Sequence, residues 1–271
     1  MREQQAMATT EINDTTIQAL GDALHEAQRG GHTIGPLTER HPDLGVEVAY
    51  RVQQRVLARR LAEGERVIGK KVGVTSQAVM DMLGVNEPDF GWLTDAMLVP
   101  HGGTIDATRL IQPKAEGEIA FVLKRRLQGP GVGVAEVLAA TECLLPCIEV
   151  VDSRIHDWRI RIGDTVADNA SCGMVVLGDR AVSPMGFDLQ TCGMVLEKNG
   201  ELVATGSGAA ALGSPANAVA WLANTLGRLG LALEAGEVVL SGALAAMCPV
   251  KRGDQVRVAI GGLGGCAARF V

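Results

Sequence analysis

Three acidic residues in two apolar, strand-like segments are the strongest candidates for chemistry in this 271-residue chain. Glu116 and Glu118 are two residues apart in the segment EGEIAFVL, and Glu149 interrupts the apolar segment CIEVVD. Alternate side chains of a strand point to the same face, so we expect Glu116 and Glu118 to lie side by side. Neighbouring carboxylates repel unless a cation lies between them, and oxygen ligands suit Mg²⁺ or Mn²⁺. The spacing therefore indicates a divalent-metal site.

Each of these acids also has an ordinary structural interpretation. On an edge strand, Glu116 and Glu118 would face solvent with no ion between them. A buried glutamate without a partner is costly, so Glu149 is expected either to bind the metal or to form an ion pair with Arg154 or Arg159. The residue types and their spacing leave both interpretations open.

A pair of lysines lies in another strand-like segment, VIGKKVGV. Because strand side chains alternate, either Lys70 or Lys71 should face inward. There the loss of hydration lowers the pKa of the ammonium and makes it suitable for proton transfer. The alternative is a lysine whose ammonium reaches the surface. Residues 88–91 (PDFG) predict a turn that presents the carboxylate of Asp89.

A third polar group lies in residues 164–171 (DTVADNAS), where polar and apolar residues alternate irregularly. Asp168, Asn169 and Ser171 are candidates for contacts with a substrate. The alternative for Asp168 and Asn169 is that they cap a turn.

Composition and charge exclude several classes of protein. The net charge is −6 and no basic run is longer than residues 124–126, so nucleic acid is not an expected partner. The longest apolar stretch, residues 218–233, contains Arg228, and the polar N-terminus has no apolar signal-peptide core, so we expect no membrane span and no signal peptide. The six cysteines include no Cys-x-x-Cys pair, which indicates reduced thiols in a cytoplasmic protein without structural zinc.

The periodicity of apolar residues predicts the elements that must position these side chains. Apolar residues at helical spacing predict helices over residues 14–29, with Asp14 or Thr15 as N-cap, and over 45–63. From Arg66 onward, short β-branched runs alternate with turns, and Asn199-Gly200 predicts a hairpin. A further helix is predicted from Pro215 to about Leu229, with Ser214 as its cap, and shorter ones near residues 76–84 and 134–141.

The sum of these elements is an α+β protein. We expect a helical N-terminal layer, residues 1–66, on a mixed, largely antiparallel, β-barrel-like body, residues 67–271. The two parts are expected to form one compact unit.

Long collinear segments of the chain resemble a known family. The chain resembles the hydratases of aromatic meta-cleavage pathways, a branch of the fumarylacetoacetate-hydrolase-like superfamily, over essentially its whole length after residue 12. The matching segments are GKKVGVTSQAVMDMLGVNEPDFGWLTDAM (69–97), IQPKAEGEIAFVL (111–123), CIEVVDSRIHDWRIRIGDTVADNASCG (147–173), EKNGELVATGSGAAALGSPANAVAWLANTL (197–226) and AGEVVLSGAL (235–244).

This resemblance implies a site and an activity. It assigns Mg²⁺ or Mn²⁺ to Glu116, Glu118 and Glu149, and proton transfer to Lys71 and Asp89. The implied reaction adds water to a small 2-hydroxydienoate, 2-hydroxypenta-2,4-dienoate, and gives 4-hydroxy-2-oxopentanoate. The substrate would bind the ion through its carboxylate and 2-oxygen. The resemblance also implies a homo-oligomer, a pentamer or a decamer, which could form a complex with 4-oxalocrotonate decarboxylase.

Two other activities occur in related families. A 4-oxalocrotonate decarboxylase would have the same metal residues, but decarboxylases tend to replace the aspartate of the P-D-F-G segment with an apolar residue, and Asp89 is retained here. An acylpyruvate-type C–C hydrolase would rely on a histidine–glutamate pair, and none of the five histidines is placed near the acids in the sequence. A catalytically inactive partner of a decarboxylase would not be expected to keep the acids together with Lys71 and Asp89. These residues favour the hydratase, with the length of the substrate's tail left open.

Overall fold

The computed structural model describes residues 12–271. The polar segment 1–11, on which the prediction of no signal peptide was based, lies outside the described residues. The helices are α1 (Asp14–Gly30), α2 (Leu37–Arg40), α3 (Val46–Ala62), α4 (Gln77–Leu83), α5 (Val134–Ala140), α6 (Ile162–Ala167) and α7 (Pro215–Arg228). The main strands are β1 (Val67–Gly73), β2 (Asp89–Thr94), β3 (Leu98–Pro100), β5 (Lys114–Leu123), β6 (Thr141–Val151), β7 (Cys172–Leu177), β8 (Gly193–Lys198), β9 (Glu201–Ser207), β10 (Val238–Leu240), β12 (Gln255–Ile260) and β13 (Gly264–Phe270), with two-residue strands β4 (Thr104–Ile105) and β11 (Cys248–Pro249).

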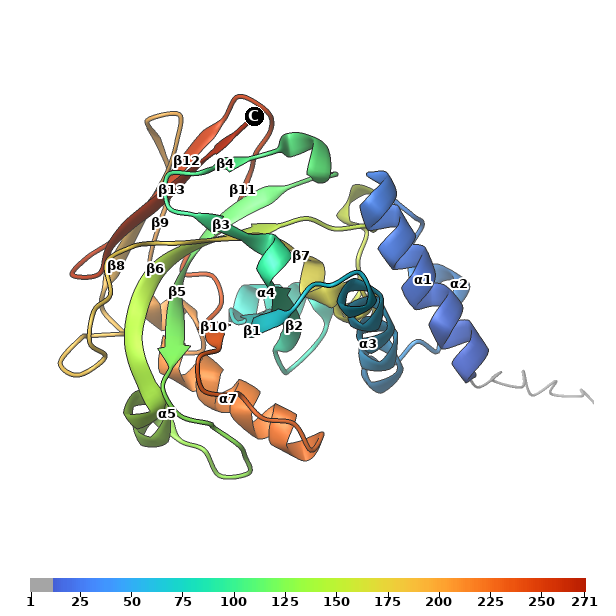
Figure 1. The fold of residues 1–271 in the computed structure, drawn as a ribbon, viewed down its shortest axis with the longest axis horizontal. Coiled ribbons are helices and arrows are strands. Elements are labelled where there is room, and N and C mark those ends of the chain that lie inside the picture. The colour runs from blue at the N-terminus through green and yellow to red at the C-terminus, as the bar shows by residue number, and fades with distance from the viewer. Residues whose placement is uncertain (1–11) are drawn as a thin grey trace, which may run out of the picture.

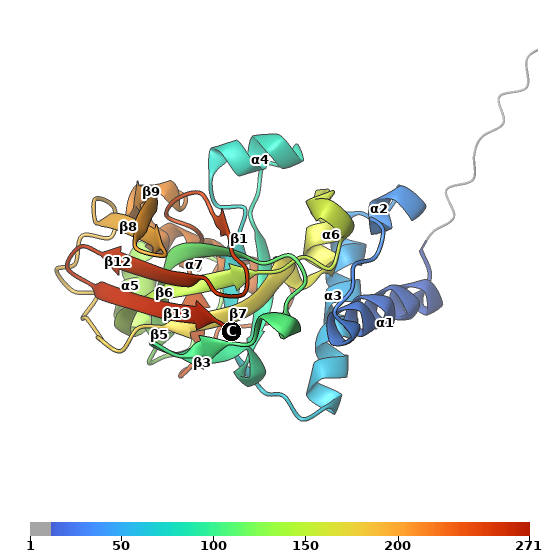
Figure 2. The same ribbon diagram turned by 90° about the horizontal axis from the view of Figure 1, so that it is seen from above.

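The helices α1 and α3 form a layer at one end of the molecule (Figures 1 and 2). Their apolar faces pack together through residues such as Leu24 and Val52, both almost fully buried. Ile155 and Val166, from the β-rich part of the chain, complete this core. The N-cap of α1 is Asn13, whose side chain accepts a hydrogen bond from the backbone of Thr16, and so the predicted caps Asp14 and Thr15 were wrong.

The main sheet is eight-stranded, with the order β2-β1-β10-β5-β6-β7-β3 and β11 paired beside β5. The pairs β1–β10 and β3–β7 are parallel, and the other pairs are antiparallel. The sheet curls so far that Leu93 of β2 and Val175 of β7, from opposite parts of this order, belong to one buried cluster. That cluster fills the inside of the curl, as a barrel-like body requires.

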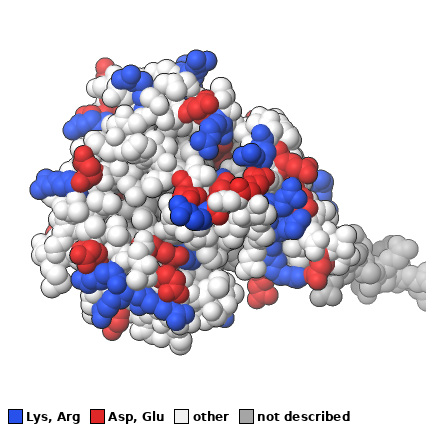
Figure 3. Space-filling model, in the orientation of Figure 1, with Lys and Arg blue, Asp and Glu red and all other residues white. Residues whose placement is uncertain are grey.

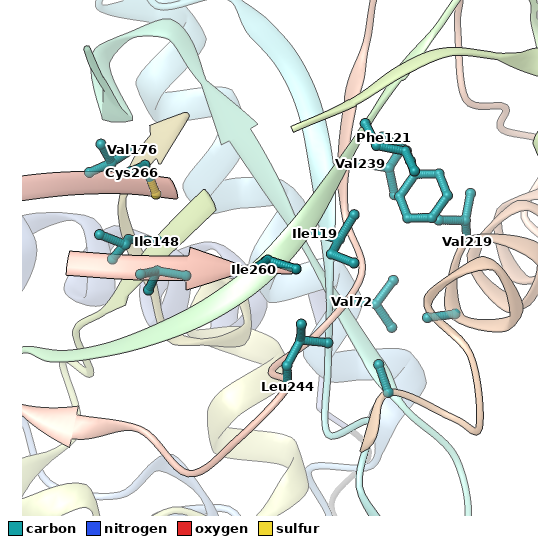
Figure 4. Packing of buried hydrophobic residues seen from close by; sticks show 14 of the residues in the cluster. Val72, Ile119, Phe121, Ile148, Val176, Val219, Val239, Leu244, Ile260 and Cys266 are labelled. Carbon is teal, nitrogen blue, oxygen red and sulfur yellow. The ribbon is translucent and has the colours of Figure 1, made fainter. Parts of the chain in front are cut away.

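A second sheet, with the order β4-β13-β12-β8-β9, and the helix α7 cover the outside of the curl (Figure 1). Figure 4 shows Phe121 and Val239 of the main sheet directed toward Val219 of α7, and Ile148 and Val176 near Cys266 of β13. The largest apolar core therefore lies between the main sheet and these outer elements.

Gly117 allows the two sheets to approach closely behind Glu116 and Glu118. A Cβ atom at this position would lie 3.0 Å from a methyl carbon of Val258 and 3.2 Å from the sulfur of Met194, both in the second sheet. The glycine side of the strand thus packs against the outer sheet while the glutamate side faces inward.

Several predicted elements are confirmed. Helices α4, α5 and α7 match the three predicted segments to within two residues, although the Ser214 side chain makes no capping hydrogen bond. Asn199 and Gly200 have φ angles of 57° and 84° in the turn between β8 and β9, as a type I′ hairpin requires. The segment 74–88, which carries α4, leaves the sheet after β1 and returns at β2, and α4 stands away from the sheet (Figure 2).

The surface and the thiols also agree with the composition. Figure 3 shows Lys and Arg mixed with Asp and Glu over most of the drawn face, with one group of basic side chains along its lower edge. Among residues 12–271, no helix is both long and apolar enough to cross a membrane. All six cysteines are free thiols, and five of them are buried.

Candidate active site

The three predicted metal ligands converge inside the curl of the main sheet. Glu116 of β5 is paired directly with Glu149 of β6, and Glu118 is opposite Cys147 on the same face. One carboxylate oxygen from each glutamate lies within 4.8 Å of the other two. Strand alternation and the antiparallel register together produce this cluster, and the interpretation of Glu116 and Glu118 as solvent-facing acids on an edge strand is wrong.

The oxygens of this cluster fit a divalent cation. Glu118 and Glu149 are fully buried, yet Glu118 Oε1 and both carboxylate oxygens of Glu149 have no hydrogen-bond donor. The backbone N–H of Gly242 donates to Glu118 Oε2 over 2.8 Å. Buried carboxylate oxygens without donors are rare and costly unless a cation satisfies them. Together with Glu116, these carboxylates form an oxygen donor set of the kind that Mg²⁺ and Mn²⁺ prefer.

The electrostatics of the cluster lead to the same conclusion. Burial and the neighbouring charge of Glu149 raise the pKa of Glu116 to about 7. Burial, with the charges of Glu149 and Glu116, raises the pKa of Glu118 well above its usual range. Crowded, dehydrated carboxylates bind protons when no other cation is available.

Lys71 provides one positive charge inside this acidic cluster. Its ammonium lies 3.3 Å from Glu149 Oε1, and the side chain is 4% exposed. Burial lowers the pKa of Lys71, but the charges of Glu149 and Asp89 outweigh burial and raise the pKa above its usual value. Without a metal ion, the surrounding carboxylates therefore favour the ammonium of Lys71, whereas burial lowers the pKa of the neighbouring Lys70. Glu149 pairs with Lys71, whereas Arg154 and Arg159 pair with other acids.

Both lysines of the pair are buried, which differs from the expectation that only one faces inward. Lys70 points to the opposite face of β1, where its ammonium contacts both carboxylate oxygens of Glu237 at 2.7 Å and lies 4.7 Å from the centre of the Trp92 ring. A complete ion pair and an aromatic face make burial of this second lysine possible.

Asp89 does not lie in a turn. It is the first residue of β2, paired with Gly73 at the end of β1. A side chain at Gly73 would collide with Asp89 Oδ1 and lie 3.2 Å from Lys71 Nζ, so this glycine leaves the space in which the two groups face each other. Burial raises the pKa of Asp89, and the charge of Lys71 partly opposes this effect. Asp89 Oδ1 is buried without a hydrogen-bond donor.

The helical layer fixes the position of β2. The Tyr50 ring of α3 stacks on Phe90 with ring centres 4.4 Å apart, and its hydroxyl accepts a hydrogen bond from the backbone N–H of Phe90. The amide of Gln53 donates to the carbonyl oxygens of Phe90 and Val166, each over 2.8 Å. The apolar pattern of α3 predicted a helix but gave no sign that Tyr50 and Gln53 hold the strand next to Asp89.

The predicted substrate-contacting residues lie in an unusual segment beside the site. Asn169, Ala170 and Ser171 all have positive φ angles, between 50° and 56°. Such angles are unfavourable for residues with a Cβ and persist where surrounding contacts enforce them. The Asn169 amide makes hydrogen bonds with both the N–H and the C=O of Trp92. Asn169 thus anchors this segment to β2, and both its polar groups are occupied.

Asp168 is also occupied by protein partners. Its carboxylate forms a buried ion pair with Arg154 and accepts hydrogen bonds from the Arg154 backbone N–H and the Ser153 hydroxyl. Arg154 in turn donates to the carbonyl oxygens of Asp152 and Cys172. This network ties together the two ends of the left-handed segment.

Ser171 is linked to Asp89 through the hydroxyl of Thr165. Its hydroxyl is 3.4 Å from that of Thr165, and the Thr165 hydroxyl is 3.5 Å from Asp89 Oδ2. Thr165 was missed in the sequence, because a threonine within a short helical segment carries no signal of a contact with a residue 76 positions away.

The comparisons with known proteins agree with this geometry. The family model of the fumarylacetoacetate hydrolase C-terminal region matches residues 30–271. The chain belongs to the fumarylacetoacetate hydrolase family. The observed fold of N-terminal helices with a curled mixed sheet is that of this family's C-terminal domain.

Curated relatives of this family member are hydratases. The chain is 64% identical over 222 residues to a 2-hydroxypent-2,4-dienoate hydratase of Pseudomonas putida, covering 82% of this chain and all of the relative. It is 53% identical to a 2-hydroxyhexa-2,4-dienoate hydratase of Comamonas testosteroni, covering 94% of this chain and 97% of the relative.

Solved structures of the family include a similar decarboxylase. A 4-oxalocrotonate decarboxylase of Pseudomonas putida G7, complexed with magnesium and adipate, has a TM-score of 0.93 and 40% identity, covering 96% of this chain and 98% of that one. A fumarylpyruvate hydrolase of Pseudomonas aeruginosa has a TM-score of 0.60 and 16% identity, covering 74% and 88% of the two chains, so this likeness concerns the fold alone.

Proposed function

We propose that this chain is a divalent-metal-dependent hydro-lyase that adds water to 2-hydroxypenta-2,4-dienoate in the meta-cleavage catabolism of aromatic compounds. The observation that carries the proposal is the meeting of Glu116, Glu118 and Glu149 with Lys71 and Asp89 inside the curled sheet. The 64% identity to a hydratase that acts on this class of dienoate supports the choice of substrate.

The three glutamates are proposed to hold Mg²⁺ or Mn²⁺. When bound there, the ion supplies Lewis-acid polarisation of the substrate's 2-oxygen and carboxylate. Glu118 Oε1 and the oxygens of Glu149, which are buried and accept no hydrogen bond, support this assignment.

Lys71 and Asp89 are proposed to move the protons. The 2-hydroxyl of the dienol loses its proton while carbon 5 gains one, which gives an α,β-unsaturated 2-keto acid. Water then gives its hydroxyl to carbon 4 and a proton to carbon 3, and the product is 4-hydroxy-2-oxopentanoate. Lys71 is suited to donate a proton, because its ammonium lies inside the site, 3.3 Å from Glu149 Oε1 and facing Asp89 across Gly73. Asp89, with its raised pKa, is suited to receive one from the 2-hydroxyl or from water.

Ser171 is proposed to contact the substrate, since its hydroxyl adjoins the Thr165–Asp89 pair. For Asp168 and Asn169 we propose an indirect role. Their polar groups are used to hold the left-handed segment that presents Ser171.

A direct assay tests the proposed function. The purified chain is incubated with 2-hydroxypenta-2,4-dienoate, with added Mn²⁺ or with EDTA, and loss of the dienol absorbance is followed together with the formation of 4-hydroxy-2-oxopentanoate. We expect turnover that EDTA abolishes and Mn²⁺ restores. Turnover that is unaffected by EDTA would contradict the metal assignment, and release of carbon dioxide from 4-oxalocrotonate without hydratase activity would replace the proposal with the decarboxylase.

The assembly and the cellular location of the enzyme are further proposals. The resemblance to the family supports a homo-oligomeric cytoplasmic enzyme, a pentamer or a decamer, that could associate with 4-oxalocrotonate decarboxylase. Light scattering coupled to size-exclusion chromatography tests the assembly. A monomer at micromolar concentration would contradict it.

A further inference from the structure

A pocket of about 470 Å³ lies beside the first residue of β5, Lys114, and none of the three glutamates lines it. Its wall consists of Ala107, residues 110–114, Trp158 and residues 249–252, and we call it the Trp158 pocket. Leu110 and Val250, both nearly buried, give part of this wall an apolar surface.

The charged residues of the Trp158 pocket all have the same sign. Lys114, Lys251 and Arg252 line it, and no Asp or Glu does. Within residues 12–271, none of these three side chains has a carboxylate within ion-pair distance. The ammonium of Lys114 is instead 4.1 Å from the centre of the Trp158 ring. Three unpaired cations on a partly apolar wall favour an organic anion as ligand.

Trp158 is held firmly in this position. Its indole N–H donates to the carbonyl oxygen of Gln112 over 3.0 Å. Asp157 and Trp158 have positive φ angles of 54° and 56°, so the backbone turns at these residues. The Trp158 ring lies against the Lys114 ammonium. The aromatic ring fixes the Lys114 ammonium by a cation–π contact and leaves its remaining N–H groups available to a ligand.

The Trp158 pocket adjoins the proposed metal site along one strand, because Lys114 lines the pocket and belongs to β5. Lys114, Glu116 and Glu118 occupy every second position of β5, so they lie on the same face of the strand. Exposure falls along this face, since Lys114 and Glu116 are half-buried and Glu118 is fully buried. The Lys114 end is therefore the more open end of this row of side chains. Residues two apart on one strand lie about 7 Å from each other, so Lys114 is close to Glu116.

We infer that the Trp158 pocket is the site through which a flat, conjugated carboxylate approaches the metal site, and that Lys114 is a specificity-determining residue that binds the carboxylate there. This inference rests on the proposed function for the identity of the natural ligand. The carboxylate meets the Lys114 ammonium and the positive field of Lys251 and Arg252, while the carbon chain lies against Leu110 and Val250. The pocket thus raises the local concentration of substrate without taking part in proton transfer.

Binding of sorbate (hexa-2,4-dienoate) tests this inference without turnover. Sorbate is a flat dienoate without the 2-hydroxyl group and is titrated into the full chain by calorimetry, in Mg²⁺ and again in excess EDTA. We expect binding in both conditions with dissociation constants within about twofold of each other, because the Trp158 pocket needs no ion. We expect Lys114→Met to weaken this binding by about tenfold. Lys124→Met, a matched change beyond the other end of β5, should leave it unchanged.

Steady-state kinetics with 2-hydroxypenta-2,4-dienoate provide the second measurement. Lys114→Met should raise KM by about tenfold, keep kcat within about twofold, and reduce the dependence of kcat/KM on ionic strength. Arg252→Gln, an exposed change that cannot disturb the core, should shift KM in the same direction by a smaller factor.

The inference is overturned if sorbate binds only in the presence of Mg²⁺, or if Lys114→Met leaves both sorbate affinity and KM unchanged. It is also overturned if Lys114→Met lowers kcat at constant KM. The sorbate titrations measure binding and need no turnover. A chain that lacks hydratase activity would therefore contradict the proposed function, while its sorbate affinity would still test the role of Lys114.

Discussion

Lys71 Nζ lies 3.3 Å from Glu149 Oε1 although β10 and β5 separate their strands in the main sheet. Neighbouring strands are about 4.8 Å apart, so in a flat sheet the axes of β1 and β6 would be roughly 14 Å from each other. The curl of the sheet brings the two side chains together. The contact shows that the fold, and not local sequence, creates the pairing of a cation with the acidic cluster.

Substitution of one glutamate should remove metal binding. We expect Glu149→Gln to lower the affinity for Mn²⁺ by at least about a hundredfold and to reduce kcat/KM by a factor on the order of 10³, because one charged ligand is lost. Calorimetric titration with Mn²⁺ measures the first effect and the dienol assay the second. Glu142→Gln, which removes an exposed acid near the start of the same strand, is the control and should retain Mn²⁺ binding. A Glu149→Gln protein that binds Mn²⁺ normally would contradict the site.

Without metal, the acidic cluster should make the protein less stable as pH rises. The pKa of Glu116 is about 7 in the folded chain against 4.5 for an ordinary glutamate, so between these values the folded state holds a proton that the unfolded state has lost. The free energy of unfolding therefore falls as pH increases from about 5 to 7.5. Urea unfolding in EDTA measures this trend.

The same measurement in saturating Mg²⁺ should give a stabilisation that grows with pH, because the ion competes with protons for these carboxylates. Glu116→Gln in EDTA is the matched control, and its stability should depend less on pH. A metal-free wild-type protein whose stability increases steadily from pH 5 to 7.5 with the same slope as Glu116→Gln would be inconsistent with the raised pKa.

The two adjacent lysines should respond differently to the same change. We expect Lys71→Met to reduce kcat by about 10²–10⁴-fold, the usual contribution of a general acid or base, while Mn²⁺ still binds. Lys70→Met should instead destabilise the protein by about 3 kcal/mol, because it leaves Glu237 without its buried partner. The folded Lys70→Met protein should keep a kcat within about threefold of wild type. Equal losses of kcat in both variants would contradict a specific role of Lys71 in proton transfer.

Relief of backbone strain next to the site should increase stability. Ala170 has a φ angle of 50°, in the left-handed region that glycine adopts without penalty. We expect Ala170→Gly to raise the free energy of unfolding by about 1 kcal/mol. Ala19→Gly, at an exposed position in the middle of α1, should lower it by about 1 kcal/mol. Urea unfolding of both variants gives the comparison, and a loss of stability in Ala170→Gly would show that the segment gains nothing from glycine.

The sequence predicted the elements better than it predicted their contacts. Apolar periodicity and turn residues located α1, α3, α7 and the β8–β9 hairpin, because these depend on neighbours within the same segment. The common face of Glu116 and Glu118 followed from strand alternation. The partnership of Lys71 with Glu149 could not be predicted, since it depends on the curl of the whole sheet.

The error at Asp89 has the same origin. Asp89 was placed in a turn because Pro and Gly flank its segment, but pairing with Gly73 extends β2 to include it. The contacts of Asp168 with Arg154 and of Asn169 with the backbone of Trp92 were also not predictable, because they depend on how the segments fold together. Contact of these two residues with a substrate stays a prediction.

The segment 74–88 leaves the main sheet at Gly73 and returns at Asp89, two residues that are paired with each other. The register of β1 and β2 is therefore set by strand pairs on the sheet side of this pair. Thr75, at the start of the segment, is buried and its carbonyl oxygen accepts a hydrogen bond from Leu212, so it belongs to the fixed part of the molecule. An engineer could change the length of residues 76–88 while Lys71 and Asp89 keep their places. The two strands thus hold the proposed proton-transfer residues independently of the connection that joins them.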